Sequence, residues 1–187
     1  MLGITLDTNA VNAAELSRIE TACAGREVEI AHTTVTDREQ EGTSFGVEAA
    51  VVVKTGVWDE SRWGQFVWGG RIPEPLVIGE SRLGSAALGT EESEARFEAI
   101  LRVIGDGGFP PRGERGTLTR GQHRQLRDAM ILEAHTREKR DLLVTNDVKG
   151  FIRLGRRERL EALCATRIMT VDEFLGWLGD NEPASPS

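Results

Sequence analysis

The sequence lacks the features that would place it in several common classes of protein. No apolar run is long enough to span a bilayer, and Met1 leads directly into an apolar stretch, so we expect neither a membrane protein nor a signal peptide. The only two cysteines, Cys23 and Cys164, lie far apart, which argues against a disulfide framework and favours a reducing cytoplasm. There is no G-x-S-x-G motif, no P-loop, and no metal-binding spacing among the three histidines.

Acidic residues outnumber basic ones, but unevenly along the chain. The formal net charge is −7, which argues against a protein that coats nucleic acid. Residues 1–111 hold 9 basic and 18 acidic side chains, whereas residues 112–159 hold 13 and 7. A basic segment around acidic motifs is expected when an anionic substrate meets a cation-loaded acidic site. A solvated helix face with pairs such as Glu133–Arg137 explains the same charges equally well.

Two short runs, residues 4–6 and 142–144, are each followed by a carboxylate with an asparagine nearby. Residues 142–144 are all apolar, which is typical of a buried strand in a parallel sheet, and Ile4-Thr5-Leu6 repeats the pattern. The polar residues that follow are Asp7 and Asn9 in one case, and Thr145, Asn146 and Asp147 in the other. Open parallel sheets bind ligands at the carboxyl ends of their strands. The sequence therefore predicts an α/β fold with two acids at one ligand-binding edge.

A third acid, Asp128, lies inside a helix predicted over residues 120–139. Its neighbours at i+3 and i+4 are Ile131 and Leu132, so it lies near an apolar face. A buried aspartate needs a compensating positive charge. That charge is either Arg124 on the preceding turn or a bound metal ion, and we favour the metal ion.

Glu39 is the candidate for a fourth acid. It follows the second predicted strand, over residues 27–32, and is placed to face the same strand ends. Its spacing from Thr36 also fits a helix capping box, which is the structural alternative. Glu41 is a second candidate for the same role.

Further elements follow from periodicity and capping patterns. Helices are expected over residues 10–24 and 91–104 and after Thr170, and a last strand over residues 167–169. Capping boxes are predicted for Thr119 with Gln122 and for Thr170 with Glu173. Residues 181–187 are polar and proline-containing and are expected to be disordered.

The middle of the chain, residues 42–118, is the hardest part to interpret. It contains Trp58, Trp63 and Trp68, three of the four tryptophans. We expect them to pack this segment onto the core, because clustered aromatic side chains are mostly buried. Base stacking or a partner surface is the functional alternative.

Several carboxylates that converge on one site repel each other unless a divalent cation lies between them. Oxygen ligands of this kind favour Mg²⁺ or Mn²⁺ over zinc. Magnesium held by carboxylates typically serves phosphoryl chemistry, in which it activates water and neutralises charge on the phosphate. The sequence therefore predicts a metal-dependent hydrolase.

Four motifs together resemble the PIN-domain family. They are LDTN near the start, VTDRE after the second predicted strand, DAMILEA in the long helix, and LLVTNDVKGF before the closing strand and helix. The similarity covers roughly residues 1–41 and 119–178, and TND in its strand context is its most specific part. The resemblance implies a single domain over residues 1–180: a three-layer α/β/α sandwich with a central parallel sheet, enlarged by an insertion at about 42–118.

The resemblance also implies an activity and a set of site residues. Many members of the family are Mg²⁺- or Mn²⁺-dependent endoribonucleases, including VapC-type toxins of toxin–antitoxin pairs. Carried over, the site consists of Asp7, Glu39, Asp128 and Asp147, supported by Asn9, Thr145 and Asn146. Asp7, Asp128 and Asp147 would hold the metal. We expect an RNA substrate whose phosphates contact Arg153, Arg156 and Arg157. The sequence leaves open RNA or DNA as substrate, an antitoxin partner, and a homodimer.

Two other functions account for some of the same residues. A PIN-like module that binds RNA or protein without cutting would share the fold, although it has no need of intact acids. A phosphatase of the haloacid dehalogenase type also opens with an apolar strand and an aspartate. That mechanism needs a second acid two residues later, where this chain has Asn9.

Overall fold

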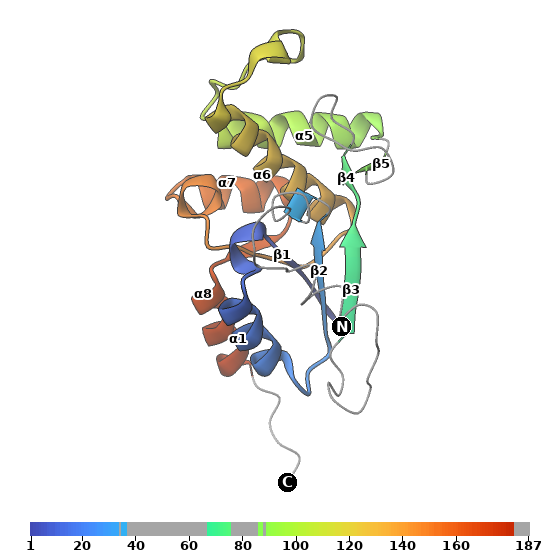
Figure 1. The fold of residues 1–187 in the computed structure, drawn as a ribbon, viewed down its shortest axis with the longest axis vertical. Coiled ribbons are helices and arrows are strands. Elements are labelled where there is room, and N and C mark those ends of the chain that lie inside the picture. Colours follow the sequence, from blue (N-terminus) through green and yellow to red (C-terminus); the bar gives the residue numbers. More distant parts are fainter. Residues whose placement is uncertain (34, 37–66, 76–85, 88, 182–187) are drawn as a thin grey trace.

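The computed structural model describes residues 1–33, 35–36, 67–75, 86–87 and 89–181, which form a parallel sheet with helices on both faces (Figure 1). The main sheet pairs five strands in the order β3-β2-β1-β6-β7, all parallel. These strands are β1 (Leu2–Leu6), β2 (Val28–Thr33), β3 (Val67–Ile72), β6 (Leu142–Val144) and β7 (Arg167–Met169). The predicted α/β class with a central parallel sheet is confirmed.

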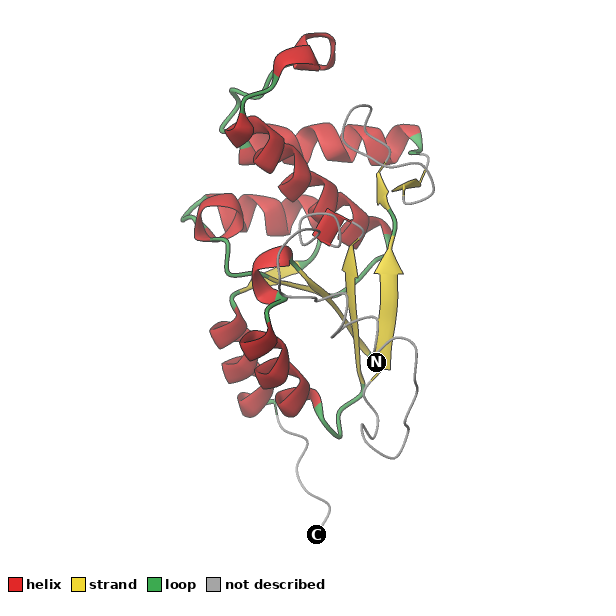
Figure 2. Cartoon of the chain, in the orientation of Figure 1, coloured by secondary structure: helices red, strands yellow, loops and turns green. Residues whose placement is uncertain are grey.

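Helices follow most of the strands (Figure 2). They are α1 (Ala13–Cys23), α5 (Glu91–Ile104), α6 (Arg120–Arg137), α7 (Arg156–Cys164) and α8 (Val171–Asp180). Shorter turns are η1 (Thr8–Ala10), η3 (Arg112–Thr117) and the π-helical η4 (Val148–Ile152), and a small second sheet pairs β4 (Glu74–Pro75) with β5 (Ala86–Ala87). None of the described helices is both long and apolar enough to cross a membrane.

Strand β6 shows how the sheet separates two cores. Successive side chains of a strand point to opposite faces. Leu142 and Val144 pack with α1 and α8, whereas Leu143 packs with α5, α6 and α7. All three side chains are buried, and each contributes about 2 kcal/mol by leaving water. A strand that is apolar on both faces therefore requires helices on both sides of the sheet, as the three-layer prediction implied.

Most predicted boundaries agree with the structure. The helix over residues 91–104, the strands over 142–144 and 167–169, and both capping boxes are confirmed. The helix predicted over residues 10–24 is present, but it begins later than predicted, at Ala13. The Asn12 side chain accepts a hydrogen bond from Glu15 N and caps α1, so η1 and α1 are separate elements.

The segment predicted as an insertion contributes to the main body. Strand β3 pairs with β2 at one edge of the sheet, and α5 packs against α6. Trp58, Trp63 and the residues around Glu39 and Glu41 lie outside the described residues, as does the tail from 182. The predictions for them therefore stay predictions.

The strand order places a switch point beside β1. The chain passes from β1 to β2 on one side, and later returns to β6 on the other side. Connections that leave in opposite directions open a crevice at the carboxyl ends of the strands between them. Leu6 is paired with Val144, so Asp7 and Thr145 emerge side by side at that crevice.

Candidate active site

Asp7 is fixed at the end of β1 by its neighbours on β6. Its backbone N–H donates to the carbonyl of Val144 over 3.0 Å. Its carboxylate oxygen Oδ2 accepts hydrogen bonds from Thr145 Oγ1 at 2.6 Å and from Asn9 Nδ2 at 3.3 Å. The side chain is buried, and these bonds to the charged form stabilise it. Asn9 and Thr145, which the resemblance implied as supporting residues, thus both bind Asp7.

Asp147 uses one carboxylate oxygen for structure. Its Oδ1 accepts from Lys149 N at 2.9 Å and from Gly150 N at 2.8 Å, and so caps η4. Its own backbone N–H donates to Thr145 Oγ1 over 3.0 Å. The Thr145 hydroxyl therefore links the two strand-end acids, because it donates to Asp7 and accepts from Asp147. The other oxygen, Oδ2, is left to serve the site.

Asp128 approaches the same point from α6. A Cβ atom built on Gly150 would lie 2.9 Å from both Asp128 Oδ2 and Asp147 Oδ2. The two carboxylate oxygens are therefore separated by at most twice that distance, and both lie close to the glycine. A side chain at position 150 would force them to move. Gly150 is a site residue that the sequence analysis missed, although its position three residues after Asp147 could have suggested it.

These acids line one open cavity of about 390 Å³. Its walls come from the ends of β1 and β6 and from one face of α6. The lining residues are Asp7, Thr8, Asn9, Arg124, Asp128, Asn146 and Asp147. All three described acids of the predicted site are thus brought together. The predicted alternative partner of Asp128, Arg124, lines the cavity but forms no ion pair with any described residue.

The donor set suits a hard divalent cation. No three histidine, cysteine, aspartate or glutamate side chains among the described residues stand close enough to form a ready-made metal centre. Mg²⁺, however, is usually held by one or two carboxylates together with water and substrate phosphate. The Oδ2 atoms of Asp128 and Asp147, which flank the space beside Gly150, meet that requirement.

Asn146 has a different role from the one predicted. Its side-chain oxygen accepts a hydrogen bond from Val171 N at 3.2 Å, and so holds the first residue of α8. This bond joins the end of β6 to the helix after β7. Asn146 lines the cavity but anchors the frame around it rather than an acid.

The three arginines predicted to contact phosphate have protein partners. Arg156 is buried, bonds to the carbonyl oxygens of Lys149 and Gly150, and pairs with Asp106 at 2.9 Å. Its guanidinium therefore has a structural task, which is to hold η4 in place, and the predicted phosphate contact stays a prediction. Arg153 also pairs with Asp106, at 2.8 Å, and Arg157 pairs with Glu173 at 2.8 Å. Phosphate would have to displace a carboxylate from either of them.

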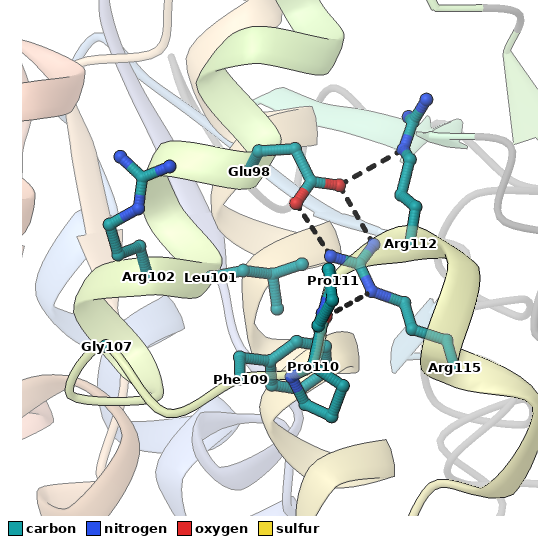
Figure 3. Close-up of a pocket in the computed structure, with 9 residues that line it drawn as sticks. All are labelled: Glu98, Leu101, Arg102, Gly107, Phe109, Pro110, Pro111, Arg112 and Arg115. Carbon is teal, nitrogen blue, oxygen red and sulfur yellow. Dashed lines mark hydrogen bonds and ion pairs between the residues drawn. The ribbon is translucent and has the colours of Figure 1, made fainter.

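A second cavity, of about 400 Å³, is lined by the end of α5 and by the segment that leads into η3 (Figure 3). The arginines of this second cavity also pair with a carboxylate of the protein. Glu98 accepts from Arg115 at 2.7 and 2.9 Å and from Arg112 at 3.2 Å. These bonds lower the pKa of the Glu98 carboxyl. The Arg115 guanidinium also lies 5.2 Å from the centre of the Phe109 ring. These interactions hold the loop that follows α5 against that helix.

A buried histidine supports the strand that carries Asp7. His135 of α6 lies between Thr5 Oγ1, 2.9 Å from its Nδ1, and Thr166 Oγ1, 2.6 Å from its Nε2. The Thr166 hydroxyl donates to Asp141 O, so it accepts from Nε2–H and leaves Nδ1 to accept from Thr5. Burial and, secondarily, the Arg140 charge lower the pKa of His135 to about 3. The histidine is therefore neutral and structural at neutral pH.

The two cysteines are also structural. Both are unpaired thiols in the interior. Burial raises the pKa of Cys23 to about 12, and burial likewise raises the pKa of Cys164. A thiol that is not ionised is neither a nucleophile nor a metal ligand.

No protein-family model matches this chain, and no curated protein sequence matches it. The family resemblance therefore depends on the sequence motifs.

Proposed function

We propose that this chain is a Mg²⁺- or Mn²⁺-dependent nuclease of the PIN type that hydrolyses phosphodiester bonds in RNA. The observation that carries the proposal is the convergence of Asp7, Asp128 and Asp147 on one cavity at the switch point of a parallel sheet. Three acids from three separate elements have no reason to share a cavity for stability alone, because their charges repel each other. An oxygen-lined site of this kind suits a divalent cation.

Each acid has its own task in this proposal. Asp128 and Asp147 present their Oδ2 atoms next to Gly150 and would hold the cation directly. Asp7 lines the same cavity, and Thr145 and Asn9 hold its carboxylate in place through Oδ2, so that it would add negative charge beside the cation. A bound cation supplies charge neutralisation at the phosphate and acidity for the attacking water.

The fixed positions of these acids are part of the same proposal. The Thr145 hydroxyl sets the spacing between the ends of β1 and β6. The cap that Asp147 forms on η4 fixes its rotamer, so its second oxygen needs no reorganisation when substrate arrives. Groups held in place before reaction are more effective than mobile ones.

The proposal is tested by incubating an end-labelled, mixed-sequence RNA with the purified protein in Mg²⁺, in Mn²⁺ and in EDTA. Asp128→Asn should abolish cleavage. Asp180→Asn is the matched control. It makes the same chemical change away from the cavity, because Asp180 is exposed at the C-terminal end of α8. A DNA strand of the same sequence shows which nucleic acid is preferred.

The other outcomes distinguish the alternatives. RNA that is bound but left intact in both metals would favour the non-cleaving module. Hydrolysis of p-nitrophenyl phosphate without any cleavage of RNA would favour the phosphatase. Cleavage by Asp128→Asn at the wild-type rate would remove the acids from the reaction and overturn the proposal.

A further inference from the structure

The arginines near the cavity differ in whether the protein already pairs them with a carboxylate. Arg112, Arg115, Arg153, Arg156 and Arg157 all bind carboxylates of the protein itself. By contrast, Arg120 and Arg124 are exposed, and neither forms an ion pair within the described part of the chain. These two guanidinium groups are therefore available to an anion without displacing a carboxylate.

The two arginines lie in a row on α6 that ends at the cavity. Arg120, Arg124 and Asp128 follow one another at four-residue intervals, so they lie on one side of α6. Arg124 lines the cavity together with the three acids. Consecutive members of the row are separated by about 6 Å along the helix axis. That is on the order of the distance between neighbouring phosphates of an extended strand.

Helix stability does not explain the charge of Arg120. It occupies the first position of α6, where the backbone already presents positive charge. A cation at this end is unfavourable for the helix. The capping box of Thr119 and Gln122 forms without any contribution from the arginine side chain. The positive charge of Arg120 is better explained by an anionic ligand that binds from solvent.

An anionic polymer also needs such a contact. The three carboxylates of the cavity repel a phosphate until a cation is bound, and the protein as a whole carries a net charge of −7. Cations beside the cavity, rather than in it, attract the phosphates next to the one that reacts. They provide binding without occupying the metal position.

We propose that Arg120 and Arg124 form a phosphate-binding track on α6, which holds the backbone of a nucleic-acid strand beside the bond that enters the Asp7–Asp128–Asp147 cavity. This inference rests on the proposed nuclease function for its ligand. The track would contact the backbone without reading bases, so it acts on all sequences equally.

The test measures binding separately from cleavage. Affinity for a fluorescent single-stranded 12-nucleotide RNA is measured by anisotropy in EDTA over a series of salt concentrations. Wild-type protein is compared with the Arg120→Gln/Arg124→Gln double variant. Arg167→Gln is the matched control. Arg167 is exposed at the start of β7, which is the end of the strand that faces away from the cavity. Melting curves of all three proteins verify that they are folded.

Two lost phosphate contacts should reduce the log–log salt slope by about 1.4, at roughly 0.7 per contact on a single strand. If the affinities converge at 1 M salt, this corresponds to a loss of roughly 25-fold at 0.1 M. Arg167→Gln should keep the wild-type slope.

Failure of the track and failure of the proposed function give different results. A double variant with the wild-type salt slope overturns the track, whether or not the protein cleaves RNA in Mg²⁺. Absence of binding by wild-type protein in EDTA, together with absence of binding by Asp128→Asn protein in millimolar Mg²⁺, where RNA is not expected to be cut, overturns it as well. A reduced slope in the double variant, together with no cleavage by wild type in any metal, would support the track and refute the nuclease.

Discussion

Gly150→Ala is the smallest change that should separate the two acids of the cavity. The new methyl group would stand 2.9 Å from Asp128 Oδ2, 2.9 Å from Asp147 Oδ2 and 3.1 Å from Asp147 Cγ. Ordinary contacts of a Cβ atom begin at 3.4 Å, so both carboxylates must retreat by a few tenths of an ångström. The backbone at Gly150 is not in the left-handed region, so alanine meets no strain of φ. The effect is therefore steric and confined to the site.

The expected result is a large loss of activity with a small loss of stability. Catalytic groups need placement within about 0.5 Å, and a displacement of about 1 Å can cost on the order of 100-fold in rate. Overpacking costs about 1–3 kcal/mol in a rigid core. The lower end applies here, since Asp147 is only partly buried and a shift of a few tenths of an ångström leaves its cap on η4 in place. We expect RNA cleavage in Mg²⁺ to fall by about 100-fold, with a melting temperature only a few degrees lower.

Gly176→Ala is the control for this experiment. Gly176 lies inside α8, and nothing lies within 4 Å of a Cβ atom placed there. Alanine should stabilise this helix by up to about 1 kcal/mol and leave cleavage unchanged. Full activity in Gly150→Ala, with both proteins folded, would show that Asp128 and Asp147 do not act as a pair. The reasoning about the cavity would then be refuted.

Two further predictions concern the frame around the site. His135 has a pKa of about 3 in the folded protein and about 6.5 in the unfolded chain. Its contribution to stability is therefore present above pH 6.5 and is lost as the pH falls toward 3. The free energy of unfolding should drop by about 2 kcal/mol between pH 7 and pH 5. Urea titrations of wild type and His135→Gln test this, and an equal pH dependence in both proteins would contradict it. Arg156→Ala should lower the free energy of unfolding by about 3 kcal/mol, because it leaves the Lys149 and Gly150 carbonyls and Asp106 without their partner. The salt slope of RNA binding should be the same in Arg156→Ala as in wild type, and a reduced slope would support the predicted contact between Arg156 and phosphate.

The elements that carry the acids could be predicted because their signals are local. A three-residue apolar run followed by Thr145-Asn146-Asp147 describes both a buried strand and its polar end. Capping boxes depend on only four residues, which is why Thr119 with Gln122 and Thr170 with Glu173 were correctly identified. The convergence of Asp7 with Asp147 follows from parallel pairing alone.

The role of individual polar residues could not be predicted in the same way, because it depends on tertiary direction. Gly155 takes a left-handed conformation, with φ of 77°, at the start of α7. Arg156 follows it and is buried against η4, which a run of basic letters does not reveal. Asn146 holds α8 through Val171, a contact across 25 positions of sequence. Gly150 matters only because α6 brings Asp128 close to it.

The central claim is that the acids of the cavity hold a cation, and four melting curves test it most directly. They are wild type and Asp147→Asn, each in EDTA and in millimolar Mg²⁺. Asparagine keeps the oxygen that caps η4 and removes the charge that faces Asp128. The two Oδ2 atoms are separated by at most twice 2.9 Å. Two unit charges about 6 Å apart repel by about 3 kcal/mol at an effective dielectric of 20, and solvent screening reduces this. Asp147→Asn should therefore melt at a higher temperature than wild type in EDTA. It should also show a smaller rise with Mg²⁺, because a weaker site binds the folded state less tightly. A variant that melts lower than wild type in EDTA, and that gains as much from Mg²⁺ as wild type does, would contradict the account.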